Sequence, residues 1–397
     1  MAETTQQSNI AQQVNVSKEE TPYVINPRQV TAILTCTMLG MGVFSLPRVT
    51  ASWAHESGWI SVLFGMLVAL FGMSIISRLN QQFTGQTVVV YSQRLLGGTG
   101  TRRGAVLSFP LLMGLTVLWA VHTSTLTRAF GEVITAVVLR ETPMSVIMFL
   151  MLAASMYMAM HEAEVIARVN ELLFVVIVIP LLLLTLLSFQ NVRWENLLPF
   201  FSVDWHLFLM SVAATSIAFA GFEIMLVLGA FVQPIAAARG AQYVGIAIPA
   251  LMNTLSTVAA IAVFSFEEVK RLMWPALDLA VSTEFPGLIL ERMEAAVLAI
   301  WFLVMHTAIG NLYFSAAKIV QEYFRLPHHQ WVVLAMFPFL LILALWPKHV
   351  HQVFEWMQIL GYISVFFWLV VPLFLLLLAF WRKLKPSKTG EMKRASN

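Results

Sequence analysis

The stretch TMLGMGVFSLPR, from Thr37 to Arg48, lies inside a segment that otherwise has the composition of a membrane-spanning helix. It places Gly40 and Gly42 near the middle of that segment and Pro47 a few residues later. Glycine inside a helix costs about 1 kcal/mol relative to alanine, and proline about 3 kcal/mol. Because a helix in a membrane depends on its own backbone hydrogen bonds, this stretch predicts that the helix is broken at its centre.

The composition is that of a polytopic membrane protein. Hydrophobic residues make up 59% of the chain and charged residues 11%, against roughly 25% charged residues in soluble domains. The net charge of +3 comes mainly from the C-terminal run WRKLKPSKTGEMKR, which suits an anionic membrane surface better than nucleic acid. Residues 1–26 are polar and lack the pattern of a signal peptide, so they are expected to form a disordered cytoplasmic tail.

Ten segments are apolar enough and long enough for membrane spans. We expect a ten-helix transmembrane domain over residues 27–383 and a basic cytoplasmic tail over residues 384–397. The expected spans are 28–50, 58–79, 104–136, 144–160, 165–188, 206–231, 240–264, 288–320, 330–346 and 355–381. Residues 80–103 are expected to form an interfacial loop with a short helix, and residues 265–287 a re-entrant or surface helix.

The lysines and arginines predict the orientation of these spans. With the N-terminus inside, most of the 24 lysines and arginines fall on the cytoplasmic side, although the C-terminal tail supplies much of that excess. The positive-inside rule therefore favours cytoplasmic positions for both termini.

A second glycine interruption lies five expected helices later, in the stretch FAGFEIMLVLG from Phe219 to Gly229. Glycine-broken helices in corresponding positions of two five-helix halves are typical of inverted-repeat transporters, whose freed backbone groups line a cavity. The N–H groups around Gly42 and Val43 would then open a half-helix and offer a site for a carboxylate. Gly40 and Gly42 alone could instead serve close helix packing, but their pairing with Gly221 favours broken helices.

Several short motifs follow one another between Asn26 and about Lys383. They are NPRQVTAILTCTMLGMGVFSLPR, GWISVL (58–63), RAFGEVI (128–134), FAGFEIML (219–226), WP (274–275), FPGLILERMEA (285–295) and LGYI (360–363). In this order they resemble the spore-germination permeases, which are the B subunits of GerA-type nutrient germinant receptors. These permeases belong to the amino acid–polyamine–organocation superfamily.

The resemblance implies an all-α fold of the LeuT type, with ten transmembrane helices in a five-plus-five inverted repeat and broken helices 1 and 6. It also implies a subunit of the spore inner membrane that senses a small nutrient together with an A subunit and a C lipoprotein. A pocket built from backbone N–H groups suits a free carboxylate, so an amino acid is the first expected nutrient. Sugars, nucleosides and inorganic ions remain open.

Polar residues within the expected spans are candidates for the site, because they are costly in a membrane. Glu223 is expected either to cap the freed N–H groups or to act by its charge, on a ligand amine or a proton path. His122 and Thr307 lie on helices that flank the broken pair in this fold class. Their alternatives are a packed histidine and a hydroxyl bonded one turn back. By the resemblance, Ala308 also faces the pocket. The candidate ligand-binding residues are Gly40, Met41, Gly42, Val43, His122, Phe219, Ala220, Gly221, Glu223, Thr307 and Ala308.

A group of charges lies towards the expected outer side. Arg128 and Glu132 are four residues apart on one helix, hence on one face. Together with Glu291, Arg292 and Glu294 they form either a structural ion-pair cluster or an outer gate.

The sequence contains no pattern for a metal site, a phosphate loop or an activated nucleophile, so neither an enzyme nor a cofactor is expected. Two functions remain: a nutrient-sensing receptor subunit, and an active secondary transporter, such as an amino acid permease, driven by protons or sodium. A proton-coupled member might carry a lysine in the middle of helix 5; its absence from residues 165–188 favours the sensor. An ion or water channel overlaps with the sensor.

Overall fold

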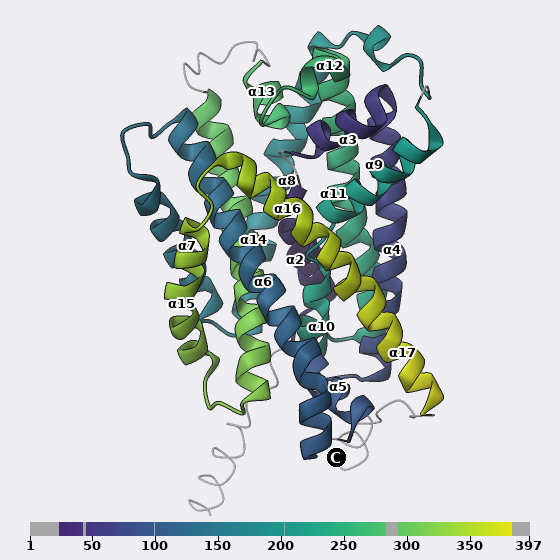
Figure 1. Ribbon diagram of the computed structural model, residues 1–397, viewed down its shortest axis with the longest axis vertical. Helices are drawn as coiled ribbons and strands as arrows, with labels where there is room; N and C mark the ends of the chain where they lie inside the picture. The colour runs from purple at the N-terminus through teal and green to yellow at the C-terminus, as the bar shows by residue number, and fades with distance from the viewer. Residues whose placement is uncertain (1–23, 43–44, 99, 202, 283–292, 383–397) are drawn as a thin grey trace, which may run out of the picture.

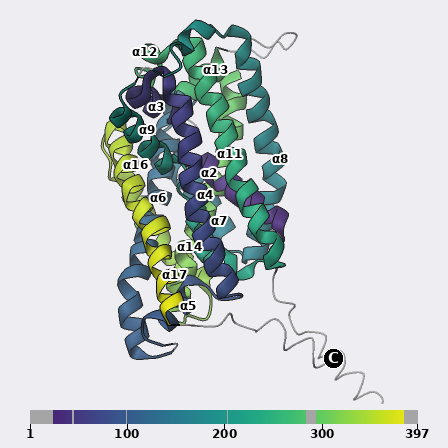
Figure 2. The ribbon, with the colours of Figure 1, turned by 90° about the vertical axis from the view of Figure 1, so that its right-hand side faces the viewer.

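The computed structural model describes residues 24–42, 45–98, 100–201, 203–282 and 293–382. Helices running mainly along one long axis make up this part of the chain (Figures 1 and 2). Six of them are long and apolar enough to cross a membrane, and three shorter helices are also apolar. The predicted class, an all-helical membrane protein with several spans, agrees with this arrangement.

The helices follow one another in the order of the spans expected from the sequence. They are α2 (Pro27–Gly42), α3 (Leu46–Ala54), α4 (Gly58–Gln82), α5 (Val88–Leu96), α6 (Arg102–Val137), α7 (Met144–Ala159), α8 (Ala163–Ser188), α9 (Trp205–Ala218), α10 (Met225–Leu228), α11 (Ile235–Phe264), α12 (Phe266–Val269), α13 (Pro275–Val281), α14 (Met293–Tyr323), α15 (His329–Leu345), α16 (Val350–Val365) and α17 (Val371–Trp381). A π-helical turn, Phe366–Val370, joins α16 to α17. We call the two ends of the bundle the α3 end, at the top of Figure 1, and the α5 end, at its bottom.

The helix that contains the opening stretch is interrupted. α2 ends at Gly42, and α3 begins at Leu46 after a turn at Ser45. Pro47 stands in the first turn of α3, where a missing backbone N–H group costs no helical hydrogen bond. The glycines thus stand at the end of one helix and the proline at the start of the next.

The second glycine stretch also separates two helical pieces. α9 ends at Ala218, and a 3-10 turn η4 (Phe222–Ile224) then leads into α10 and a further turn η5 (Gly229–Phe231). Gly221, between α9 and η4, has a φ angle of 108°. Because this left-handed conformation is strained for residues with a side chain, glycine is required there.

α2 lies in the middle of the bundle and packs closely against its neighbours. A Cβ atom on Gly40 would lie 2.4 Å from the Cβ atom of Ala308 on α14. A Cβ atom on Gly42 would lie 2.8 Å from the Cβ atom of Ala218 on α9. The glycines therefore also allow close helix packing, which was the alternative interpretation of the sequence. The contact of Gly42 with Ala218 brings the two helix interruptions together.

The connections expected from the sequence contain short helices. The expected loop 80–103 holds α5, and the expected surface segment 265–287 holds α12 and α13 at the α3 end (Figure 1). Residues 283–287 lie outside the described part of the chain, as do most of the two expected tails.

A backbone pairing joins the start of α2 to the end of the second interrupted helix. The N–H group of Ile25 donates to the carbonyl of Phe231 at 2.8 Å, and that of Gln233 donates to the carbonyl of Ile25 at 3.0 Å. Asn80, near the end of α4, donates its side-chain amide to the carbonyl of Met225 at 3.1 Å. These contacts hold the pieces of the second interrupted helix against α2 and α4.

Candidate functional site

A cavity of about 330 Å³ lies between α3, α6, α9 and α16. Its lining combines apolar, hydroxyl and charged side chains from these four helices. The residues that line it are Ser45, Leu46, Arg48, Val49, Ser52, Trp53, His122, Thr125, Leu126, Ala214, Ala218, His351, Phe354, Glu355, Met357 and Gln358. Ligand cavities for small molecules begin at about this size.

The cavity reaches both helix interruptions. Ala218, which ends α9, and Ser45, which precedes α3, line it. A second cavity of about 30 Å³ is lined by Ser45 together with Gly40 and Gly42. Ser45, three residues after the end of α2, thus lines both cavities, and the larger of the two has the volume for a small ligand.

His122 brings a polar side chain from α6 to the wall of the large cavity. Its side chain is buried, and within the described residues its Nδ1 atom has no hydrogen-bond partner. A buried nitrogen without a partner costs about 1–3 kcal/mol. His122 therefore lines the cavity, but its unpaired Nδ1 atom is not exposed to it.

Glu223 lies inside the second interruption and is completely buried. One carboxylate oxygen, Oε2, accepts a hydrogen bond from the N–H group of Gly221 at 2.7 Å. The other, Oε1, accepts one from the indole N–H group of Trp119 on α6 at 3.3 Å. These are the bonds of the capping role, which is one of the two predicted roles.

Thr307 and Ala308 lie on α14 behind the end of α2. The hydroxyl of Thr307 donates to the carbonyl of Val304 at 2.9 Å or to that of Leu303 at 3.1 Å. This is the structural alternative that the sequence left open for Thr307. Ala308 faces the Cα atom of Gly40, so its role in the structure is helix packing.

The predicted site residues therefore divide into two groups. Gly40, Gly42 and His122 line a cavity. A second group is buried beside the interruptions without lining either of these cavities: Phe219, Ala220, Gly221, Glu223, Thr307 and Ala308. Val43 lies outside the described residues, and the side chain of Met41 is not described.

The charged lining of the large cavity was missed from the sequence. Arg48 follows the proline of the opening stretch and was counted only as a loop charge. Glu355 lies at the edge of an expected span, near the start of α16. The apolar pattern at both positions indicates a helix end rather than a site, and only the packing of both α3 and α16 against α9 brings them to one cavity.

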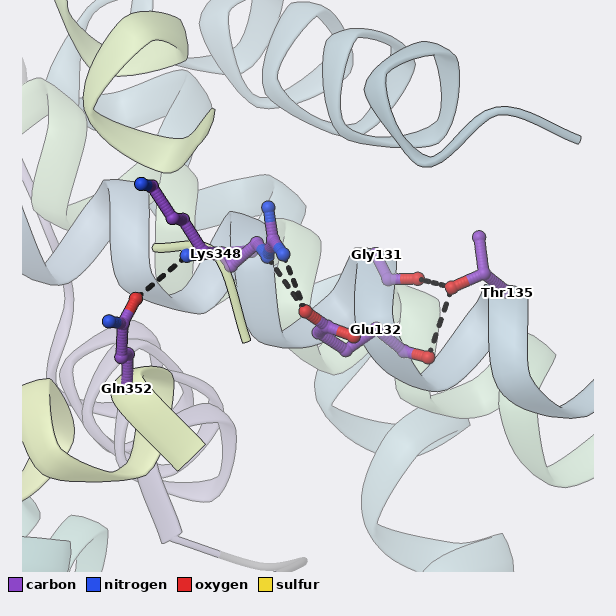
Figure 3. Close-up of polar contacts among 6 residues, drawn as sticks. Gly131, Glu132, Thr135, Lys348 and Gln352 are labelled. Carbon is purple, nitrogen blue, oxygen red and sulfur yellow. Dashed lines mark hydrogen bonds and ion pairs between the residues drawn. The ribbon is translucent and has the colours of Figure 1, made fainter. Parts of the chain in front are cut away.

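Arg128 and Glu132 form the ion pair expected from their spacing on α6. The guanidinium of Arg128 lies 2.7 Å from the carboxylate of Glu132. Figure 3 shows Glu132 between Thr135 and the turn in which the N–H group of Lys348 donates to the side chain of Gln352 at 2.8 Å. Both residues of the ion pair belong to α6, so the pair has the form that the structural interpretation predicts. Glu291 and Arg292 lie outside the described residues, and the side chain of Glu294 is not described.

Replacements of Glu223 should separate its capping role from a role of its charge. Glu223→Ala leaves the donors of Gly221 and Trp119 unpaired and should lower the free energy of unfolding by about 1–3 kcal/mol. Glu223→Gln keeps one acceptor oxygen and turns an amide NH2 group towards the other donor, so its effect should be intermediate. Thermal unfolding of the purified protein measures the capping role. The nutrient dose–response of spores, the assay that the resemblance to germinant receptors implies, measures the role of the charge.

The control is Trp119→Phe, which removes the second donor. Trp119→Phe should lower the free energy of unfolding less in the Glu223→Gln background than in wild type. In that background one donor faces another, and the substitution removes the indole N–H group that faces the new NH2 group. A stable Glu223→Gln protein whose dose–response midpoint shifts tenfold would contradict a purely capping role.

Mhp1 and MhsT are two of the solved structures whose fold is similar to this one. Mhp1, a nucleobase-cation-symport-1 family transporter in a closed conformation with bromovinylhydantoin bound, gives a TM-score of 0.65 at 12% identity, over 95% of this chain and 82% of that one. MhsT in complex with L-phenylalanine gives a TM-score of 0.61 at 15% identity, over 89% of this chain and 88% of that one. The described helices therefore have the arrangement of LeuT-fold transporters, as predicted.

Sequence relatives cover nearly the whole chain. Spore germination protein YndE of Bacillus subtilis (strain 168) is 29% identical over 360 residues, which span 90% of this chain and 97% of the relative. Spore germination protein A2 of the same organism is 26% identical over 373 residues, which span 93% and 99%. Spore germination protein B2, also from that organism, is 24% identical over 357 residues, which span 89% and 95%. The family model for spore germination proteins, Spore_permease, matches residues 24–353. The chain belongs to this family of spore germination proteins.

Proposed function

We propose that this protein is the membrane subunit of a spore nutrient germinant receptor, and that it binds a small nutrient in the cavity between α3, α6, α9 and α16. The observation that supports this proposal is the contact between the two helix interruptions. Gly42 lies against Ala218, which lines a cavity of about 330 Å³. A ligand seated there touches both interrupted helices at once. Its binding can therefore change the angle between their halves and alter the protein surface elsewhere.

The proposed nutrient is an amino acid, and the proposed partners are a receptor A subunit and a C lipoprotein in the spore inner membrane. MhsT, which shares the fold, is a complex with L-phenylalanine. In the proposed fold the chain has ten transmembrane helices in a five-plus-five inverted repeat, with both termini cytoplasmic. α2 with α3, and α9 with η4 and α10, are its broken helices 1 and 6.

The second candidate is an active secondary transporter for an amino acid, coupled to protons or sodium. The observation that favours it is the fold itself, because the name of Mhp1 describes a cation symport family transporter. The described part of α8, the expected fifth helix, holds no lysine and only the arginine Arg168, whose guanidinium pairs with the carboxylate of Glu164 in the first turns of the helix. A lysine at the middle of this helix, which could carry a coupling proton, is therefore missing.

Spores from which all other germinant receptors have been deleted can decide between the two. Restoring this chain together with its A and C partners should restore germination by at least one of the twenty amino acids. Membrane vesicles that contain the chain alone should take up no more of that radiolabelled amino acid than empty vesicles do. Gradient-driven uptake in the vesicles, with no nutrient of any class triggering germination, would favour the transporter instead.

A further inference from the structure

The large cavity carries charges of opposite sign on two of the helices that line it. Arg48 comes from the first turn of α3, and Glu355 from the second turn of α16. Within the described part of the chain neither side chain takes part in an ion pair or a side-chain hydrogen bond. The guanidinium carbon of Arg48 instead lies 5.3 Å from the centre of the Phe354 ring.

The contact with Phe354 helps to hold Arg48 at the cavity. A guanidinium above an aromatic face is attracted by the charge distribution of the ring and keeps its N–H groups for other partners. The planar fork of N–H groups then remains free to bind a carboxylate through two parallel hydrogen bonds. Such a bond is stronger inside a cavity than in bulk water, because the surroundings screen it less.

Glu355 offers the complementary group. A carboxylate that no cation of the described residues neutralises can accept hydrogen bonds from an ammonium group. The cavity lining also includes apolar side chains, with Leu126 and Met357 as examples. Glu355 is exposed and Arg48 is half-buried, so a ligand with both charges exchanges water at these two side chains for direct hydrogen bonds, which an uncharged ligand cannot offer.

We propose that Arg48 and Glu355 select an α-amino acid in its zwitterionic form, with the carboxylate on Arg48 and the ammonium group on Glu355. This inference rests on the proposed function, since it names the ligand class of that cavity and the residues that choose it. The apolar wall takes the side chain of the amino acid. The volume of about 330 Å³ suits one amino acid rather than a longer peptide.

The test uses three probes on the reconstituted spores: the most effective amino acid, its N-acetyl derivative without an ammonium group, and its primary amide without a carboxylate. In wild type, both derivatives should need at least tenfold higher concentrations than the amino acid. In Glu355→Gln the preference over the N-acetyl derivative should disappear, while the preference over the amide remains. In Arg48→Gln the preference over the amide should disappear, while the preference over the N-acetyl derivative remains.

The matched controls are Arg193→Gln and Glu195→Gln. Both side chains are exposed on the connection between α8 and α9 and do not line the cavity. They should leave all three dose–response curves unchanged. Arg48→Lys keeps the charge without the fork and should lose part of the preference over the amide, at a protein level shown by immunoblot to be normal.

The inference and the proposed function fail in different ways. If Arg48→Gln and Glu355→Gln spores keep the wild-type preferences, or if only uncharged nutrients trigger germination, the charge assignment is wrong and the receptor function stands. If no nutrient triggers germination, the receptor function is wrong. In that case the charge assignment is tested without germination, by the thermal stabilisation of the purified protein and its two variants with each of the twenty amino acids.

Discussion

Spores that carry Ala214→Leu are expected to lose their nutrient response while the protein remains in the membrane at its normal level. Ala214 lies on α9, is 7% exposed and lines the large cavity. Leucine adds three carbon atoms that point into a space of about 330 Å³ bounded by helix ends. A ligand must then compete with the new side chain, so we expect at least a hundredfold shift of the dose–response midpoint. This shift corresponds to about 2.7 kcal/mol.

The preceding residue provides the control. Ala213 lies on the same helix but is exposed and does not line the cavity. Ala213→Leu adds the same atoms on the outer face of α9 and should leave the response unchanged. Dose–response curves and immunoblots of both variants would be measured side by side. Overlapping curves for Ala214→Leu and wild type would place the nutrient outside this cavity.

A loss of stability as large as that of Glu223→Ala is expected where α2, α8 and α14 meet. Asn170 and Asn311 exchange amide hydrogen bonds at 2.9 and 3.0 Å, and Asn311 also donates to the hydroxyl of Thr37 at 2.8 Å. All three side chains are fully buried. Asn311→Leu leaves the side-chain oxygen of Asn170 without its donor, while the amide nitrogen still donates to the carbonyl of Ile166 at 2.8 Å, and it should lower the free energy of unfolding by about 1–3 kcal/mol.

Replacing both asparagines tests this explanation. In the double variant Asn170→Leu with Asn311→Leu no amide is left unpaired, so the variant should be more stable than Asn311→Leu alone. Thermal unfolding of the detergent-purified proteins measures the difference. A double variant that loses the sum of the two single losses would mean that packing, rather than the hydrogen bonds, stabilises this contact.

The fold could be predicted from the sequence to a large extent, because its signals are local. The apolar lengths predict the membrane helices, and the glycine pair of the opening stretch predicts where α2 ends. Gly221 marks the second interruption, because no other residue takes its backbone angle without strain. Family membership, which rests on motifs along the whole chain, makes the protein a membrane component of the germination system and not an enzyme.

The site could be predicted only in part, because it depends on how distant helices are rotated. His122 was singled out because a histidine in a span is conspicuous, and it lines the proposed cavity. Thr307 and Ala308 lie on α14, where the hydroxyl of Thr307 bonds back within the helix and Ala308 packs against Gly40 of α2, so neither lines the proposed cavity. Arg48 and Glu355 stand near opposite ends of the chain, and no spacing in the sequence relates them.

The pairing of Ile25 with the segment that follows η5 has a consequence for how the protein opens. Its two backbone hydrogen bonds tie the start of α2 to the end of the second interrupted helix. α2 cannot swing away from that segment unless both bonds break and both amide protons meet water. Hydrogen–deuterium exchange at Ile25 and Gln233 therefore reports the opening of this side of the protein, and its rate gives the population of the open state without any assay of germination.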